Sequence, residues 1–324
     1  MWYFIIGYGY YTVIYTLLQR IFRFTLFSGR FILILLTALH SAGAVGLEAS
    51  PLGKTLFTAI SVAVLTAAVY VLLVRPGKPN PDFGLLRGYL FAHRGLYGFT
   101  GYPENSLPAF REAAARGYGA ELDVRMTRDG RLAVMHDESL ERTAGADVKL
   151  SGLSSAELAE YTLFGGEHIP MLEEVLPIFE GGPPLMIEIK PTGMRAARLC
   201  SAFADAMQGF HGIWCVESFD PRVVFWMRRH MPQVVRGQLS RRFTRSSPVR
   251  GPAALLLTHM LFNALTRPDF ISYRFDDRHR LPFRLATARG GAGRVLWTIR
   301  SGADLEKALD LNSIPIFEGF DPHA

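Results

Sequence analysis

The sequence predicts an α/β fold, a (β/α)8 TIM barrel preceded by N-terminal transmembrane helices. Long uncharged apolar runs are confined to residues 1–80. From residue 85 to residue 324, short apolar stretches alternate with helical patterns, at about eight strands in roughly 240 residues. Polar and charged side chains also follow those strands, where the active sites of such barrels lie. The alternative is an open doubly wound sheet, but no glycine-rich phosphate-binding turn opens a helix here.

Charge divides the chain at the same point. Residues 1–80 contain six basic residues and one acidic residue, whereas the rest contain 29 basic and 28 acidic ones. Basic residues beside apolar runs are typical of a membrane protein, so we expect the lipid bilayer as a partner. The balanced remainder gives no reason to expect a nucleic acid, and we expect no protein partner. Cys200 and Cys215 lack metal-ligand spacing, which favours buried free thiols over a disulfide.

Three segments of the first 80 residues are candidate membrane helices: residues 2–18, 31–47 and 55–74. The last holds twenty uncharged residues, which is the length needed to cross a bilayer core. The first is rich in Trp, Tyr and Phe, so it either spans the membrane or lies in its interface. A soluble protein with a buried apolar helical hairpin is the alternative. The turn-rich residues 76–81 form a linker that ends this anchor domain of residues 1–80.

The orientation follows from the basic residues that flank these segments. One group flanks the second predicted span, at Arg20, Arg23 and Arg30, and the other follows the third, at Arg75, Lys78 and Arg87. The connection between Glu48 and Lys54 has no net charge. The positive-inside rule therefore predicts a multi-pass protein of the cell membrane, with residues 19–30 and everything after residue 75 in the cytoplasm.

Residues 85–324 form the predicted barrel domain. The expected strands are residues 89–92, 119–124, 131–135, 185–189, 213–217, 234–239, 269–273, 294–299 and 314–317. The expected helices are residues 107–116, 194–207 and 221–230, with two more near 278–288 and 302–309. The first strand delivers His93 and Arg94 to a loop containing Gly95, and either Asn105 or Ser106 caps the helix that follows.

Three carboxylates stand on predicted strands that should be buried. Glu121 and Asp123 are two residues apart on one strand, so both point to the same face, and Glu188 occupies the end of another strand. Carboxylates on the inner face of a barrel are destabilising unless a cation or another partner compensates them. With no soft ligand nearby, the set predicts one hard divalent cation, Mg²⁺ or Ca²⁺.

Other strand ends carry groups suited to a phosphate. Arg94 and Lys190 favour an anionic substrate, while His93 and His136 offer an acid–base pair near neutral pH. Taken singly, each histidine favours a structural role over a catalytic one. Together with the metal-binding set, these residues indicate phosphodiester cleavage.

Over about residues 85–324, the chain resembles the glycerophosphodiester phosphodiesterase family. The resemblance rests on five ordered motifs, His93-Arg-Gly95, Pro103-Glu-Asn-Ser106, Glu121-Leu-Asp123, His136-Asp137 and Glu188-Ile-Lys190, with weaker matches at Ser218-Phe-Asp220 and Trp297-Thr298. The family usually has Thr where Ser106 stands, and both residues can cap a helix. The last strand, residues 314–317, departs from the usual ending.

The resemblance implies hydrolysis of glycerophosphodiesters to an alcohol and sn-glycerol 3-phosphate, with Glu121, Asp123 and Glu188 as metal ligands. His93 and His136 would be the general acid and base, in an order that stays open, and Arg94 and Lys190 would bind phosphate. A capping insertion is expected near residues 140–170. The alternatives are phospholipase D-like cleavage of lysophospholipids or sphingolipids on the same barrel, and an inactive membrane-bound phosphodiester sensor.

Two further side chains are candidates for the substrate pocket. Glu104 either reaches the metal through water or favours the start of the following helix electrostatically. Trp297 either lines the glycerol pocket or fills the barrel.

One arginine-rich stretch is not explained by the family. Arg241, Arg242, Arg245 and Arg250 precede the apolar residues 253–262. This pattern is typical of a solvated loop followed by a barrel helix, and it also fits a patch that contacts anionic lipid headgroups near the barrel mouth.

Overall fold

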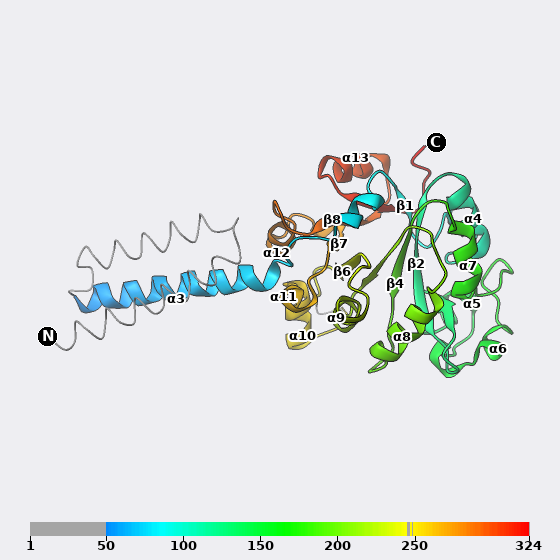
Figure 1. Cartoon of the computed structure of the whole chain (residues 1–324), viewed down its shortest axis with the longest axis horizontal. Coiled ribbons are helices and arrows are strands. Elements are labelled where there is room, and N and C mark those ends of the chain that lie inside the picture. The colour runs from blue at the N-terminus through cyan, green and yellow to red at the C-terminus, as the bar shows by residue number, and fades with distance from the viewer. Residues whose placement is uncertain (1–49, 245–246, 248, 324) are drawn as a thin grey trace. The chain divides into compact units, whose positions relative to one another are not determined.

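The computed structural model describes residues 50–244, 247 and 249–323. It divides into two units between Leu72 and Leu73. The predicted segments 2–18 and 31–47 lie outside the described residues. The third predicted segment is helix α3 (Pro51–Val74), drawn in blue in Figure 1. This helix of 24 residues is long and apolar enough to cross a membrane, and it is the one helix of this kind among the described residues. The prediction of several such helices is therefore met by one helix in this part of the chain.

The second unit contains a closed sheet of eight parallel strands. These are β1 (Phe91–Ala92), β2 (Gly119–Met126), β4 (Leu185–Ile189), β5 (Trp214–Ser218), β6 (Arg236–Ser240), β7 (Phe270–Arg274), β8 (Gly293–Ile299) and β9 (Ile314–Phe317). Each pairs with the next, and β1 pairs with both β2 and β9. This closure confirms the barrel and excludes the open sheet. The register places Asp123 opposite Glu188, and Glu188 opposite Glu217, at one level of the barrel.

The strand predicted at residues 131–135 is not a barrel strand. It is β3 (Leu132–Val134), which pairs antiparallel with β2, with Val134 opposite Val124. The turn at Asp129-Gly130 reverses the chain, and Gly130 there has a φ of +91°. Because β3 runs backwards, it returns the chain toward the middle of β2 instead of to a new barrel strand end.

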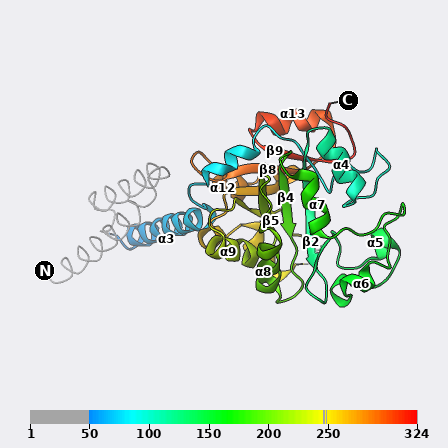
Figure 2. The same ribbon diagram turned by 45° about the vertical axis from the view of Figure 1, so that its right-hand side comes forward.

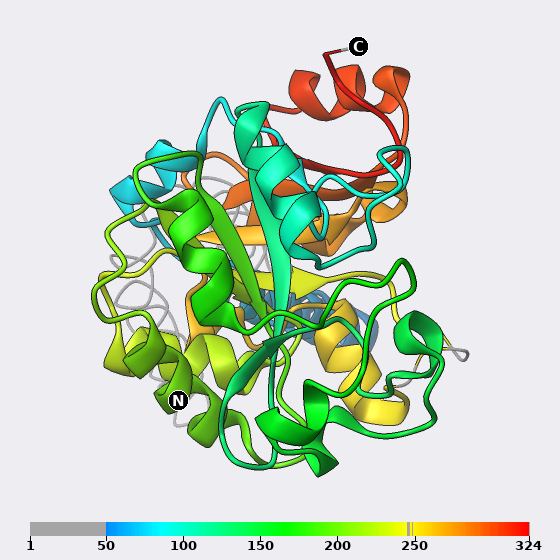
Figure 3. The same cartoon turned by 90° about the vertical axis from the view of Figure 1, so that its right-hand side faces the viewer.

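Helices cover the outside of the barrel. They are α4 (Leu107–Ala115), α7 (Leu172–Phe179), α8 (Ala196–Ala206), α9 (Pro221–His230), α10 (Gly251–Thr258), α11 (Asn263–Thr266), α12 (Leu281–Ala286) and α13 (Gly302–Asp310), with the 3₁₀ turn η4 (Phe275–Asp277). Helices α4 and α7 lie side by side in Figures 1 and 2. Figure 3 shows both crossing in front of β2 and β4. Their amphipathic sequences place apolar residues such as Phe110 and Phe179 toward the sheet.

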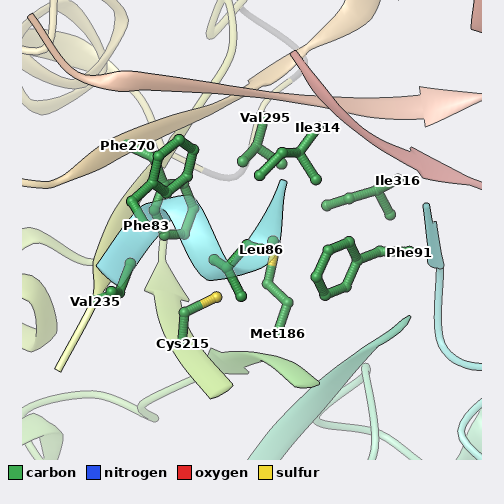
Figure 4. Close-up of a cluster of buried hydrophobic side chains, with 10 residues drawn as sticks. All are labelled: Phe83, Leu86, Phe91, Met186, Cys215, Val235, Phe270, Val295, Ile314 and Ile316. Carbon is green, nitrogen blue, oxygen red and sulfur yellow. The ribbon is translucent and has the colours of Figure 1, made fainter. Parts of the chain in front are cut away.

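The barrel interior is apolar at the end where the parallel strands begin. Phe83 and Leu86 come from the 3₁₀ turn η2 (Pro81–Leu86) and point among the strand side chains (Figure 4). Phe83 stacks on Phe270 with ring centroids 5.6 Å apart. Gly293 lets the Phe83 ring approach, since a Cβ there would lie 2.1 Å from it. This turn therefore closes the end of the barrel opposite the C-terminal ends of the strands.

The segment between β3 and α7 forms a small substructure beside the barrel. It contains α5 (Glu141–Ala144), the 3₁₀ turn η3 (Leu150–Gly152) and α6 (Ser155–Leu158). Its buried residues form, with Ala133 of β3, a cluster separate from the barrel core: Met135, Leu140, Leu150, Leu158, Leu163 and Ile169. The substructure thus has apolar packing of its own. Both cysteines of the chain are free and buried.

Candidate active site

The loop after β1 carries the first two site residues. Arg94 and Gly95 both adopt positive φ angles, +57° and +80°. A Cβ on Gly95 would lie 2.9 Å from the backbone of Ala109, so this turn requires glycine. Helix α4 then begins with Ser106 as its cap, because the Ala109 N–H donates to Ser106 Oγ at 3.4 Å.

Asn105, the other candidate cap, has a different role. Its Nδ2 donates to Asp123 Oδ2 at 2.9 Å, and both side chains are buried. The positive φ of Asn105, +54°, is tolerated by this residue type. The loop that presents His93 therefore also fixes a carboxylate of the next barrel strand.

Three carboxylates meet at the strand ends as predicted. One oxygen each of Glu121, Asp123 and Glu188 lies within 4.8 Å of the others. All three residues are buried, at 3%, 0% and 7% exposure. The alternation of β2 turns Glu121 and Asp123 to the same inner face, and the register with β4 brings Glu188 beside Asp123.

The electrostatics of this cluster leave negative charge uncompensated. Burial, together with repulsion from Asp123 and Glu188, raises the pKa of Glu121 well above its usual range. Burial also raises the pKa of Glu188 to about 7, although Lys190 opposes the shift. Burial acts in the same direction on Asp123, but the cations Lys190 and Arg94 outweigh it and hold its pKa below the usual range. Lys190 Nζ lies 3.2 Å from Asp123 Oδ1 and 2.9 Å from Glu188 Oε2.

These residues fit a hard divalent cation. Asp123 Oδ1 is buried and accepts no hydrogen bond from the described residues, although Lys190 is close. A bound cation would supply the missing positive charge, and three carboxylate oxygens suit Mg²⁺ or Ca²⁺. Lys190 and Arg94 contribute two positive charges against three carboxylates, and Arg94 is shared with Glu104, so they do not replace the cation.

His93 is held by a carboxylate that the sequence did not single out. Its Nδ1 lies 2.5 Å from Glu318 Oε2, and its Nε2 lies 3.9 Å from Glu121 Oε2. Glu318 also accepts from Tyr97 and Arg300. Despite partial burial, which acts in the opposite direction, His93 and Arg300 lower the pKa of Glu318 to about 2. Because Glu318 is ionised, His93 Nδ1 carries the proton and Nε2 is left as an acceptor facing the carboxylate cluster.

His136 is held in the same way. Its Nδ1 lies 2.6 Å from Asp137 Oδ1, and burial lowers the pKa of His136 to about 4. The residue before it, Met135, donates its N–H to the Asp123 carbonyl at 2.9 Å. The returning strand β3 thus brings His136 to the level of the cluster. His136 does not close a parallel barrel strand, which corrects the expectation drawn from the sequence.

Arg94 and Glu104 form an ion pair at the edge of the cluster. Arg94 Nη1 donates to Glu104 Oε1 at 2.9 Å, and Arg94 Nε lies 3.4 Å from Asp123 Oδ2. Glu104 also accepts from Arg142 of helix α5, at 2.6 and 2.8 Å. Both arginines lower the pKa of Glu104 despite its burial. Glu104 therefore lies between two guanidinium groups, and the substructure of residues 140–170 is tied directly to the site.

Trp297 lies on β8 and packs against the barrel core. Its ring meets Phe219 edge to face, with centroids 5.8 Å apart. The buried indole Nε1 donates to none of the described residues. This donor leaves Trp297 able to bind an oxygen of a ligand as well as to fill space.

Glu217 on β5 is a fourth buried acid in the barrel, and it was not among the site residues predicted from the sequence. It lies opposite Glu188 in register and is 2% exposed, and its Oε2 accepts no hydrogen bond from the described residues. Burial and the nearby Glu188 raise its pKa well above the usual range. The sequence pattern could have identified Glu217. It follows the apolar Cys215 by two residues on a strand, as Glu188 follows Met186, so each acid shares the inward face of its apolar neighbour.

Comparison with known proteins identifies relatives of this arrangement. The model of the Glycerophosphoryl diester phosphodiesterase family matches residues 93–317. A glycerophosphodiester phosphodiesterase of Bacillus altitudinis is 42% identical over 109 residues, which cover 31% of this chain and 44% of that protein. Glycerophosphodiester phosphodiesterase 1 of Mus musculus is 31% identical over 195 residues, covering 54% of this chain and 58% of the relative. The chain thus spans about half the length of these relatives.

Solved structures share the fold at low sequence identity. A phosphodiesterase of Oleispira antarctica, in complex with the product sn-glycerol-3-phosphate, has a TM-score of 0.60 and 20% identity, over 73% of this chain and 94% of the other. A glycerophosphodiester phosphodiesterase of Thermotoga maritima has a TM-score of 0.56 and 22% identity, over 72% and 95%. The matched residues 93–317 make up more than half of the chain and contain every site residue described above except Glu318. The chain therefore belongs to the glycerophosphoryl diester phosphodiesterase family.

Proposed function

We propose that this chain hydrolyses glycerophosphodiesters to an alcohol and sn-glycerol 3-phosphate with the help of one divalent cation. The observation that supports the proposal most is the meeting of three buried carboxylates with two histidines, each of which is oriented by a further carboxylate. The relatives named as glycerophosphodiester phosphodiesterases support the same reaction.

In this proposal Glu121, Asp123 and Glu188 hold the cation, Mg²⁺ or Ca²⁺. When bound there, the cation would supply positive charge that offsets the charge developing on the phosphoryl oxygens. Arg94 and Lys190 border the same space and bind the remaining phosphate oxygens. Their guanidinium and ammonium groups are already positioned by Asp123, so little reorientation is needed when substrate arrives.

The histidines move the protons. One Nε2 accepts the proton of the attacking hydroxyl, from water or from the 2-hydroxyl of the glycerol moiety, as the P–O bond forms. The other histidine, in its protonated form, donates to the leaving alcohol as its P–O bond breaks. If the 2-hydroxyl attacks, the product is a cyclic phosphate that water opens in a second step of the same kind. Glu318 and Asp137 keep Nδ1 protonated throughout and so keep Nε2 directed to the substrate.

We also propose how the chain is organised around this site. Residues 1–80 form a membrane anchor and linker, residues 85–324 form the catalytic barrel, and residues 140–170 cap its mouth. The contacts of Arg142 with Glu104 and Asp137 support the capping role. Glu104 and Trp297 contribute to the substrate pocket, and the enzyme acts from the cytoplasmic side of the cell membrane.

Product analysis tests the function. The purified full chain is incubated with glycerophosphocholine and Mg²⁺ or Ca²⁺, and we expect glycerol 3-phosphate and choline in equal amounts. EDTA and Glu121→Gln should each abolish the release. Activity that survives both would contradict the metal-binding assignment. Release of choline from lysophosphatidylcholine without turnover of glycerophosphocholine would instead support phospholipase D-like cleavage, and no turnover of either would support a phosphodiester sensor.

A further inference from the structure

A second pocket lies beside the barrel, outside the site described above. It has a volume of about 460 Å³ and lies between the chain that leaves β6, helix α10 and the residue before α12. Its lining includes Arg242, Phe243, Arg250, Ala254, Leu255 and Arg280. This volume is in the range of pockets that hold small organic ligands.

The polar side of this pocket is strongly basic. Arg280 Nε lies 3.7 Å from Asp277 Oδ1, and the backbone N–H of Arg242 donates to Asp277 Oδ2 at 2.9 Å. No carboxylate of the described residues pairs with the guanidinium groups of Arg242 and Arg250. Three arginines therefore line the pocket, and only the side chain of Arg280 is paired with Asp277, which leaves a net positive charge. Guanidinium forks are suited to phosphate oxygens.

The other side of the pocket is apolar and open to solvent. Helix α10 has the sequence GPAALLLT and contains no buried residue. Leu255 is 59% exposed and is also part of the pocket lining. A helix that is apolar on every side is usually buried in a protein core or a membrane. Since none of its residues is fully buried, and Leu255 is exposed while Leu256 and Leu257 are half-buried, α10 lacks part of the apolar surroundings that such a sequence favours.

Charge and apolarity therefore lie side by side in one site. We propose that this pocket binds the phosphate of an anionic phospholipid, and that the exposed Leu255 of α10 enters the adjoining acyl region of the bilayer surface. Arg242 and Arg250 hold the phosphate, and Leu255 contacts the acyl chain. A soluble phosphate would use the arginines but would leave Leu255 exposed, so the apolar helix favours a lipid. Arg245, which the sequence groups with these arginines, lies outside the described residues.

An exchange experiment on the full chain tests the proposal without using activity. The protein is placed in nanodiscs of phosphatidylcholine alone or mixed with phosphatidylglycerol, and deuterium uptake of residues 251–258 is compared. We expect uptake about tenfold slower in the mixed lipid, because arginines near an anionic surface favour binding. Arg242→Gln combined with Arg250→Gln should remove the difference. The matched control combines Arg111→Gln with Arg198→Gln, exposed arginines on α4 and α8, and should keep it.

Other outcomes would overturn the proposal. These are equal uptake in both lipids, a difference that survives the double substitution, or the same slowing when inorganic phosphate is added to phosphatidylcholine nanodiscs. Leu255→Ser provides a second variant, expected to reduce the protection while leaving the arginines in place. The proposed hydrolysis is tested separately, because both the double variant and Leu255→Ser should turn over glycerophosphocholine at the parental rate.

Discussion

Each histidine of the site meets a carboxylate through Nδ1, although the two carboxylates come from unrelated places in the chain. Asp137 is the neighbour of His136, whereas Glu318 follows the last barrel strand and is 225 residues from His93. An ionised partner on Nδ1 fixes both the tautomer and the ring orientation. Arg142 and Arg300 in turn form ion pairs with these two carboxylates, so each histidine is supported by a carboxylate and, behind it, a guanidinium group.

Removing the carboxylate of Glu318 should impair the proposed catalysis more than substrate binding. In Glu318→Ala, His93 loses its Nδ1 acceptor, and we expect kcat to fall by about 10- to 100-fold, part of the 10²–10⁴-fold contribution of general acid–base catalysis. KM should change little because Glu318 does not contact the carboxylate cluster. Steady-state kinetics with glycerophosphocholine measure both constants.

Tyr97→Phe is the matched control for this change. It removes the 3.1 Å hydrogen bond to Glu318 Oε2 but leaves the carboxylate on His93. A kcat close to the parental value is expected. If Glu318→Ala also retains the parental kcat while its melting temperature is unchanged, His93 does not depend on Glu318 for its orientation.

Single residues show where sequence reasoning ends. Glu121, Asp123 and Glu188 could be predicted, because acids two residues apart on an apolar strand share a face and parallel strands end together. Glu318 could not be chosen in this way, since its importance depends on β9 pairing with β1. Glu217 had the same alternation as Glu188, but it belongs to no recognisable motif.

At the scale of elements, the paired strands β2 and β4 hold the three carboxylates close together. Burial and mutual repulsion raise the pKa of Glu121 and Glu188, so a divalent cation should stabilise the barrel by binding the folded state alone. At a metal concentration about 100-fold above Kd, we expect the melting temperature to rise by about 5–10 °C. Scanning calorimetry of the detergent-solubilised chain, with and without EDTA, measures the shift.

Glu188→Gln is the informative variant for this measurement. It relieves repulsion without changing side-chain volume, so the metal-free protein should melt at the parental temperature or above it, and the response to metal should shrink. A metal-induced rise that is as large in Glu188→Gln as in the parent would place the cation elsewhere.

The start of α4 couples the catalytic loop to a helix. Ser106 Oγ accepts from Ala109, and loss of such a cap costs about 1 kcal/mol of unfolding free energy. Ser106→Ala should therefore destabilise the chain by about that amount in urea unfolding. Ser106→Thr retains the hydroxyl and should restore most of the stability. Equal destabilisation by Ala and Thr would show that packing around this buried residue, and not the cap, is responsible.

The strands themselves could be located from the sequence to within about two residues, but the direction of β3 could not. An apolar stretch such as residues 132–134 has the same pattern in a parallel or an antiparallel pair. The direction follows from the tight turn at Gly130, which is too short for the crossover that a parallel neighbour requires. The Asp129-Gly130 pair carried this information.

At the scale of the whole molecule, the barrel was predictable because alternation of strands and helices is regular over residues 85–324. The 3₁₀ turn η2, which closes the end where the strands begin, was not predictable. Phe83 and Leu86 follow a run rich in proline and glycine that is typical of a linker, and only the packing around Phe270 shows that they belong to the core. Local sequence pattern identifies elements, whereas residues that close a barrel are recognised by their tertiary contacts.

The proposed membrane orientation can be tested with cysteines, because the two native thiols are unreactive. Burial raises the pKa of Cys200 to about 12 and that of Cys215 well above its usual range. Met194 on the barrel is 87% exposed, and Leu52 near the start of α3 is 79% exposed. Basic residues after α3 predict a cytoplasmic barrel. A membrane-impermeant maleimide should therefore label Leu52→Cys in intact cells, but Met194→Cys only after the cells are opened. Labelling of Met194→Cys in intact cells would reverse the orientation, and labelling of neither until opening would show that Leu52 does not face the outside.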